Sequence, residues 1–237
     1  SSFFFRYSAI ICLGDISSVG MITSIYQDAI NDITDNIHKT PSYFMAGNHD
    51  GIVNGIRAYK KIFMNKDDKL YFRMDNGKIH MLFLYMLWDD TDFSKKQEKW
   101  LINQLESIPQ DDTVIVLSHC YVTGSGYYDS AAKKNWGDIP SVIDRLCPIL
   151  EKYNVDLYLS GHNHFFELLE KSDVDYVILG SMGGKLDENL IYSSPYSKWV
   201  NNTDFGWVDM EVYEENLKLT IYKYDGTVLK EKIVATK

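Results

Sequence analysis

The sequence has little of what marks a membrane protein, a disulfide scaffold or an array of linked modules. No apolar run approaches the roughly 18 residues that cross a bilayer, and residues 1–6 lack the layout of a signal peptide. The three cysteines lie in or beside apolar runs, so we expect reduced, packed thiols rather than disulfides. Internal repeats, low-complexity tracts and Pro- or Ser-rich linkers are missing too, which indicates one domain over residues 1–237.

Basic residues are in the minority. The chain has 24 Lys and Arg residues and 33 Asp and Glu residues, which gives a net charge of -9. That sign disfavours general binding to nucleic acid, so any contact with phosphate must come from a local site. With 237 residues, 45% of them hydrophobic, the chain can bury the core of one large domain.

Strand-like apolar runs alternate with segments of helical period. The first unit is a strand at 9–13, a helix at 22–37 and a strand at 43–46. The second is a strand at 114–117, a helix at 142–153 and a strand at 157–159. Such β-α-β units predict parallel pairing, with ligands at the carboxyl ends of the strands.

The remaining segments complete an α/β fold with a β-rich C-terminal part. Residues 79–87 form a long apolar run, and 97–105 have helical period. After Gly161 the pattern predicts strands at 165–169, 176–179, 207–213 and 217–224.

Four short polar segments each follow a predicted strand. Asp15 follows the first, where its carboxylate would bind a cation or cap the next helix. Gly47-Asn48-His49-Asp50 follows the strand at 43–46 and combines an amide, an imidazole and a carboxylate, although Gly-Asn is also common in turns.

The other two segments are rich in histidine. His119 follows the strand at 114–117, as a structural residue or a ligand. Its neighbour Cys120 is disfavoured as a nucleophile, because adjacent residues of an extended chain face opposite ways. His162 and His164 share a face at i and i+2, so both can present a nitrogen to one cluster. Since the strand ends of one parallel sheet form one rim, we expect all four segments to converge.

The ordered segments resemble the signature of the calcineurin-like metallophosphoesterase superfamily, which reads Asp-x-His, Gly-Asp, Gly-Asn-His-Asp/Glu, His and Gly-His-x-His. The last four blocks stand here as Gly14-Asp15, Gly47-Asn48-His49-Asp50, His119 and Gly161-His162-Asn163-His164. The resemblance implies a four-layer α-β-β-α sandwich with two mixed sheets.

The resemblance also implies a role for each residue. Asp15 would bridge two metal ions, Asn48, His119 and His162 would complete the second site, and His164 would bind the first. His49 would not be a metal ligand; it would face the phosphate and protonate, or hydrogen-bond, the leaving oxygen. Asp50 would orient a neighbour or cap a helix.

This sequence departs from the family pattern in two places. The Asp-x-His block, which supplies two ligands of the first metal, is absent upstream of Gly14, and we expect a chain that lacks the native N-terminal strand carrying it. Ser18 and Val19 replace the Asp and Arg of the Ser/Thr protein phosphatase branch, which disfavours that activity.

We therefore expect a metal-dependent phosphoesterase that hydrolyses a small phosphomonoester or phosphodiester through a metal-bridging hydroxide. The ligand set suits two ions of Mn, Fe, Zn or Co. The alternative is a non-catalytic scaffold of the same fold that binds partner proteins. The odd thiol count favours a cytoplasmic location, while export or anchoring by an upstream segment and the oligomeric state stay open.

One further stretch leaves two interpretations open. Residues 121–136 contain Tyr127, Tyr128 and Trp136 together with Lys133 and Lys134. They would form a lid that stacks on a base and meets phosphate, or a solvated loop with a few packed rings.

Overall fold

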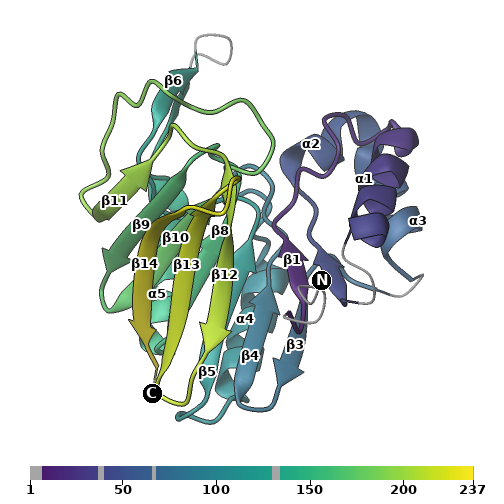
Figure 1. The fold of residues 1–237 in the computed structure, drawn as a ribbon. Coiled ribbons are helices and arrows are strands. Elements are labelled where there is room, and N and C mark those ends of the chain that lie inside the picture. Colours follow the sequence, from purple (N-terminus) through teal and green to yellow (C-terminus); the bar gives the residue numbers. More distant parts are fainter. Residues whose placement is uncertain (1–6, 37–39, 66–67, 130–133, 237) are drawn as a thin grey trace.

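A seven-stranded mixed sheet forms the centre of the molecule (Figure 1). The computed structural model describes residues 7–36, 40–65, 68–129 and 134–236. From edge to edge the strands are β11 (Ser197–Asn201), β9 (Phe166–Lys171), β10 (Val174–Leu179), β8 (Leu157–Ser160), β5 (Thr113–Ser118), β4 (Ile79–Phe83) and β3 (Phe72–Asn76). The central strands β4, β5, β8 and β10 are parallel, so their carboxyl ends lie at one edge.

The central strand β5 shows why this sheet is buried on both faces. All six of its residues are buried, as expected for a nearly continuous apolar run between parallel neighbours. Val114 and Val116 belong to one hydrophobic cluster, while Ile115 and Leu117 belong to another. The alternation follows from the two-residue period of a strand and divides the core into two layers.

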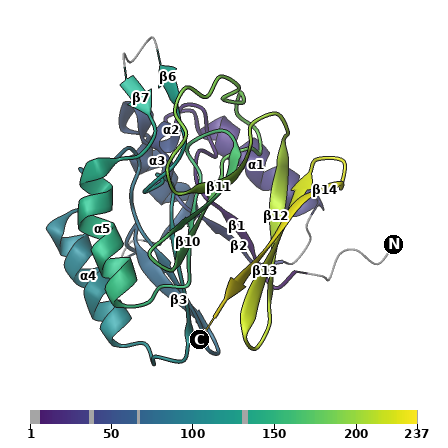
Figure 2. The same cartoon turned by 90° about the vertical axis from the view of Figure 1, so that its left-hand side faces the viewer.

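Two helices cover one face of this sheet, α4 (Lys95–Glu106) and α5 (Pro140–Lys152) (Figure 2). Ser94 caps α4 by accepting a hydrogen bond from the Gln97 backbone, and Pro140 occupies the first turn of α5. The buried faces of both helices pack against the Val114 side of β5.

The opposite face packs against a second layer that consists of two separate sheets. One is the antiparallel sheet of β12 (Gly206–Val212), β13 (Asn216–Lys223) and β14 (Val228–Ala235). The other is a parallel pair, β1 (Ile10–Cys12) and β2 (Ser42–Phe44). The core on this side joins Leu217, Leu219 and Ile221 of β13 to the central sheet.

A helical group covers the pair β1 and β2 on the outside (Figure 1). It contains α1 (Thr23–Asn36), α2 (Asn48–Gly51), the short 3-10 helix η2 (Ile52–Asn54) and α3 (Gly55–Phe63). Tyr26 and Tyr59 are buried at its centre, and the Tyr59 hydroxyl donates a hydrogen bond of 2.7 Å to the Phe44 carbonyl. The α-β-β-α fold class is therefore confirmed.

The remaining pair of strands is the hairpin β6 (Tyr127–Asp129) and β7 (Lys134–Trp136). Lys133 lies outside the described residues, so the lid interpretation is untested at that position. In the part of the chain that is described, no helix is long and apolar enough to cross a membrane.

One expectation about the sheets was wrong. The strands before Asp15 and Asn48 do not belong to the sheet that carries His119 and His162; they form the separate pair β1 and β2. The four segments still meet, because Met45 and the buried side chains of β5 and β8 pack the two sheets face to face.

Candidate functional site

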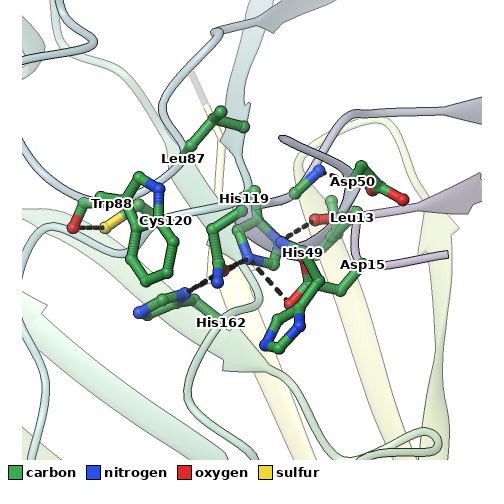
Figure 3. A network of polar contacts seen from close by, with 12 residues as sticks. Leu13, Asp15, His49, Asp50, Leu87, Trp88, His119, Cys120 and His162 are labelled. Atoms are coloured by element: carbon green, nitrogen blue, oxygen red, sulfur yellow. Dashed lines mark hydrogen bonds and ion pairs between the residues drawn. The ribbon is translucent and has the colours of Figure 1, made fainter. Parts of the chain in front are cut away.

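Four of the expected ligands come together where strands of the two sheets end (Figure 3). Asp15 follows β1, Asn48 begins α2 after β2, His119 follows β5, and His162 follows β8. Asp15 and His162 adopt positive φ angles, 56° and 69°. Non-glycine residues in this region are uncommon, and such strain is often retained at functional sites.

The polar atoms of these four side chains lie within a few ångströms of one another. Asn48 Oδ1 is 2.8 Å from both His119 Nε2 and His162 Nδ1. The two histidine nitrogens are 3.3 Å apart, and His119 Nε2 is 3.4 Å from Asp15 Oδ2. One carboxylate oxygen, one amide oxygen and two imidazole nitrogens therefore point into a common space.

The hydrogen bonds of His119 determine which atom it presents there. Its Nδ1 is 2.7 Å from the Leu13 carbonyl, which can only accept, so Nδ1 carries the proton. In the neutral ring, Nε2 then presents a lone pair toward Asn48 Oδ1 and Asp15 Oδ2, which are also acceptors. Several lone pairs that converge in this way require a cation or extra protons between them, and a metal-binding histidine is commonly oriented by just such a bond to a carbonyl.

The charge on Asp15 is also consistent with a site that binds a cation. Burial raises the pKa of Asp15, but the neighbouring His119, when its ring is protonated, and the hydrogen bond from the His49 backbone N–H outweigh burial and hold the pKa below its usual value. Among the described residues, no three His, Cys, Asp or Glu side chains by themselves form a group able to hold a metal ion. The close arrangement seen here depends on the amide oxygen of Asn48 as a fourth member.

The side chain of His49 lies beside this cluster of four side chains but takes no part in the contacts between them. Its backbone N–H donates to Asp15 Oδ1 at 2.8 Å, and its Nδ1 lies 3.0 Å from the Ser18 carbonyl. Because the carbonyl is only an acceptor, Nδ1 carries a proton and Nε2 is the nitrogen left for a substrate.

Asp50 stabilises the backbone of the loops that form the site. Its buried carboxylate accepts hydrogen bonds from the backbone N–H groups of Gly47 at 2.8 Å, Ser17 at 3.0 Å and Ile16 at 3.4 Å. Burial raises the pKa of Asp50 above its usual value. Both expectations for Asp50 are confirmed: it orients the backbone of the loop after β1, and the bond it accepts from the Gly47 N–H caps the start of α2.

Two glycines allow the loops to approach so closely. A Cβ atom at Gly47 would overlap the backbone nitrogen and carboxylate of Asp15. A Cβ at Gly14, where φ is 104°, would lie 2.6 Å from the His119 ring. The Gly-Asp and Gly-Asn sequences are therefore steric requirements of the site.

His164 contacts a different segment from the other expected ligands. Its Nδ1 donates to the Lys185 carbonyl at 2.8 Å, and its backbone N–H donates to Asp187 at 2.8 Å. The ring also packs against Gly184. Its Nε2 has no proton in the neutral form and is the atom available for a ligand bond.

Aromatic rings surround His162, and one of them, Trp88, lies outside the segments predicted to form the site. Trp136, Tyr121 and Trp88 have ring centroids 5.0, 5.9 and 6.1 Å from the His162 ring. Trp88 directly follows the apolar run at 79–87, and β4 is parallel to β5, so the strand-end rule could have placed Trp88 at the same edge as His119 but not in contact with His162.

Comparison with known proteins identifies the family. The sequence model of the calcineurin-like phosphoesterases matches residues 5–166, more than half of the chain. The chain belongs to this phosphoesterase family.

Several proteins similar to this chain carry the name of an acid phosphatase, one of them with the description inactive. Human "Tartrate-resistant acid phosphatase type 5" is 27% identical over 66% of this chain and 54% of its own length. "Probable inactive purple acid phosphatase 9" of Arabidopsis thaliana is 26% identical over 67% of this chain and 27% of its own length. A purple acid phosphatase from yellow lupin seeds shares the fold, with a TM-score of 0.81 at 19% identity over 97% of this chain and 47% of that one. The chain spans about half the length of the human relative it matches.

Proposed function

We propose that the protein is a metal-dependent hydrolase of phosphate esters, acting at the cluster of Asp15, Asn48, His119 and His162. The observation that carries the proposal is the convergence of lone pairs within 2.8–3.4 Å. Ligand atoms bound to one transition metal at about 2.0–2.2 Å would be separated by similar distances. The mixed nitrogen and oxygen donors suit Mn, Fe, Zn or Co.

The residues present would hold one ion tightly and would offer a second ion only Asp15 and His164. Asp15 would be the shared residue, as the family pattern implies; its Oδ2 faces His119, and its Oδ1 accepts the His49 backbone N–H. His164 is the candidate further ligand of the other ion. When bound, such a pair of ions stabilises negative charge on the phosphoryl group and activates water.

His49 would supply the proton in this reaction. With Nδ1–H held on Ser18, the doubly protonated ring of His49 also carries a proton on Nε2, which it would donate to the ester oxygen as its bond to phosphorus breaks. The products are then an alcohol and a phosphate, and His49 regains its proton from solvent. Asp50 acts only by positioning, because it holds the backbone of the loops that carry Asp15 and Asn48.

Replacement of His49 tests the assignment. In His49→Ala we expect turnover of phenyl phosphate to fall about 100-fold or more, since a general acid contributes about that much. Para-nitrophenyl phosphate should lose less, because its leaving group needs little protonation. Metal content, measured by elemental analysis, should be unchanged.

His80→Ala is the matched control. His80 lies near the amino end of β4, where it contacts Asp75 and Asp112, at the end of the sheet away from the site. It should lose stability and keep its turnover rate. Equal rates for His49→Ala and the unaltered protein would refute the catalytic role, and a protein that binds metal without turnover would favour the scaffold alternative.

A further inference from the structure

The residues around His162 include a partly exposed tryptophan that the chemistry above does not use. We infer that Trp88 forms one wall of a subsite for a planar aromatic group on the phosphate ester. This makes aryl or nucleobase-bearing esters better ligands than aliphatic ones. The inference rests on the proposed function for the position of the phosphate, and adds the class of organic group that accompanies it.

The geometry places the Trp88 ring at the edge of the site. Its centroid is 6.1 Å from that of His162, with the ring planes at 78° (Figure 3). His162 in turn contacts Asn48 and His119. A phosphate held at these residues would therefore carry its organic group within reach of the indole.

A second tryptophan supports the first. Trp136 is stacked with Trp88 at 6.3 Å with 29° between the planes, and lies 5.0 Å from His162. Trp136 is only 8% exposed, whereas Trp88 is 40% exposed. Trp136 is thus the packed member of the pair, and Trp88 is the member that offers surface to a ligand.

The backbone of Trp88 is fixed on both sides. Its N–H donates to Asp92 Oδ2 at 3.0 Å, and its carbonyl accepts from Cys120 Sγ at 3.1 Å. Cys120 directly follows His119, so the loop that carries the indole is tied to the segment that carries the ligand. A ring held in place in this way loses little entropy on binding, which favours recognition by stacking.

The position of Trp88, rather than its accessible area, points to a ligand. Trp207 is almost equally exposed, at 39% against 40%, but only Trp88 of these two lies beside His162. Aromatic faces stack on other planar rings better than on saturated groups of equal size. We therefore expect Trp88 to favour ligands that carry a flat aromatic ring.

Direct binding of two matched probes tests the subsite without turnover. Benzylphosphonate and cyclohexylmethylphosphonate carry the same charged group and rings of similar size, and neither is hydrolysed. By titration calorimetry on the metal-loaded protein, we expect the benzyl compound to bind about tenfold more tightly. Trp88→Ala should abolish this preference, and Trp88→Phe should retain most of it.

Trp207→Ala is the control variant. Trp207 is 39% exposed and stacks on Tyr222 at 5.4 Å, on β12 of the antiparallel sheet. It should keep the full preference. A preference that survives in Trp88→Ala, an equal loss of both probes in that variant, or no binding of either probe would overturn the subsite.

The outcomes separate this inference from the proposed function. If the preference depends on Trp88 but no phosphate ester is hydrolysed, the subsite stands and the catalytic proposal fails. If esters are hydrolysed but Trp88→Ala changes neither the binding ratio nor the ratio of kcat/KM for aryl and alkyl esters, only the subsite fails.

Discussion

At the scale of single residues, the site depends on which atom each side chain presents. His119 and His49 both donate Nδ1–H to a carbonyl, of Leu13 and Ser18, and so expose Nε2. The two histidines nevertheless have different neighbours. His119 Nε2 faces Asp15 and Asn48, whereas the His49 ring takes no part in the contacts between these side chains. Each ring is oriented by a different backbone carbonyl, and both carbonyls belong to the loop after β1.

Asp50 offers a test of this local order. Asp50→Ala leaves the Gly47 and Ser17 N–H groups without their acceptor inside the protein, so we expect a loss of about 3 kcal/mol in the free energy of unfolding. Urea denaturation followed by circular dichroism measures it. Metal affinity should fall as well, because these amides fix the loops of Asp15 and Asn48.

Asp50→Asn is the informative companion. Its amide oxygen keeps one acceptor in place, so it should recover more than half of the lost stability. Ordinary surface substitutions change the free energy of unfolding by about 0.5 kcal/mol or less. A change no larger than this in Asp50→Ala would show that Asp50 does not organise the loops.

The sequence located the polar residues better than the aromatic ones. Asp15, Asn48, His119 and His162 were predicted because each lies two or three residues beyond a predicted strand, and strand ends share an edge. Trp88 directly follows the apolar run at 79–87, but it lies five residues beyond the end of β4. Its approach to His162 depends on the turn fixed by Asp92 and on Cys120, contacts that no local pattern reveals.

At the scale of elements, short loops bring the two sheets together at the site. The loop after β1 and the turn before α2 meet with no room for a side chain at Gly47. Gly47→Ala should displace Asp15 and the start of α2, and lower metal affinity about 10- to 100-fold, as loss of an orienting contact does. Competition with a chelator measures the change.

Gly183→Ala provides the comparison for that variant. A Cβ there meets nothing within 4 Å, and the position does not require a positive φ. Its metal affinity should match that of the unaltered protein. Unchanged affinity in Gly47→Ala would contradict the close approach as a requirement of the site.

Long periodic elements and short apolar strands were predicted well, whereas the helices after β2 and the charged strand β14 were not. The helices α1, α4 and α5 and the strands β5, β8 and β13 fall where the apolar pattern indicates. The segment 48–63 instead breaks into α2, η2 and α3, because Val53 and Asn54 adopt positive φ angles that no periodicity encodes. β14 was missed because it is an edge strand with Lys and Glu on its exposed positions.

At the scale of the whole molecule, the site exists because two sheets pack face to face. Met45 beside β2 and Leu117 and Leu159 of the central sheet share one hydrophobic cluster. This packing holds Asp15 and Asn48 on one side and His119 and His162 on the other. The sequence predicted the convergence correctly but assigned it to a single sheet, since strand patterns do not show which strands pair.

Metal stoichiometry is the measurement that tests the central claim most directly. After saturation with manganese, iron, zinc or cobalt and removal of excess metal, elemental analysis should find about one tightly held ion per unaltered chain, at the cluster of Asp15, Asn48, His119 and His162. In His119→Ala, which removes the nitrogen facing Asn48 and Asp15, the value should fall by about one ion. An unaltered protein that retains no metal, or a variant that retains as much as the unaltered protein, would contradict the account.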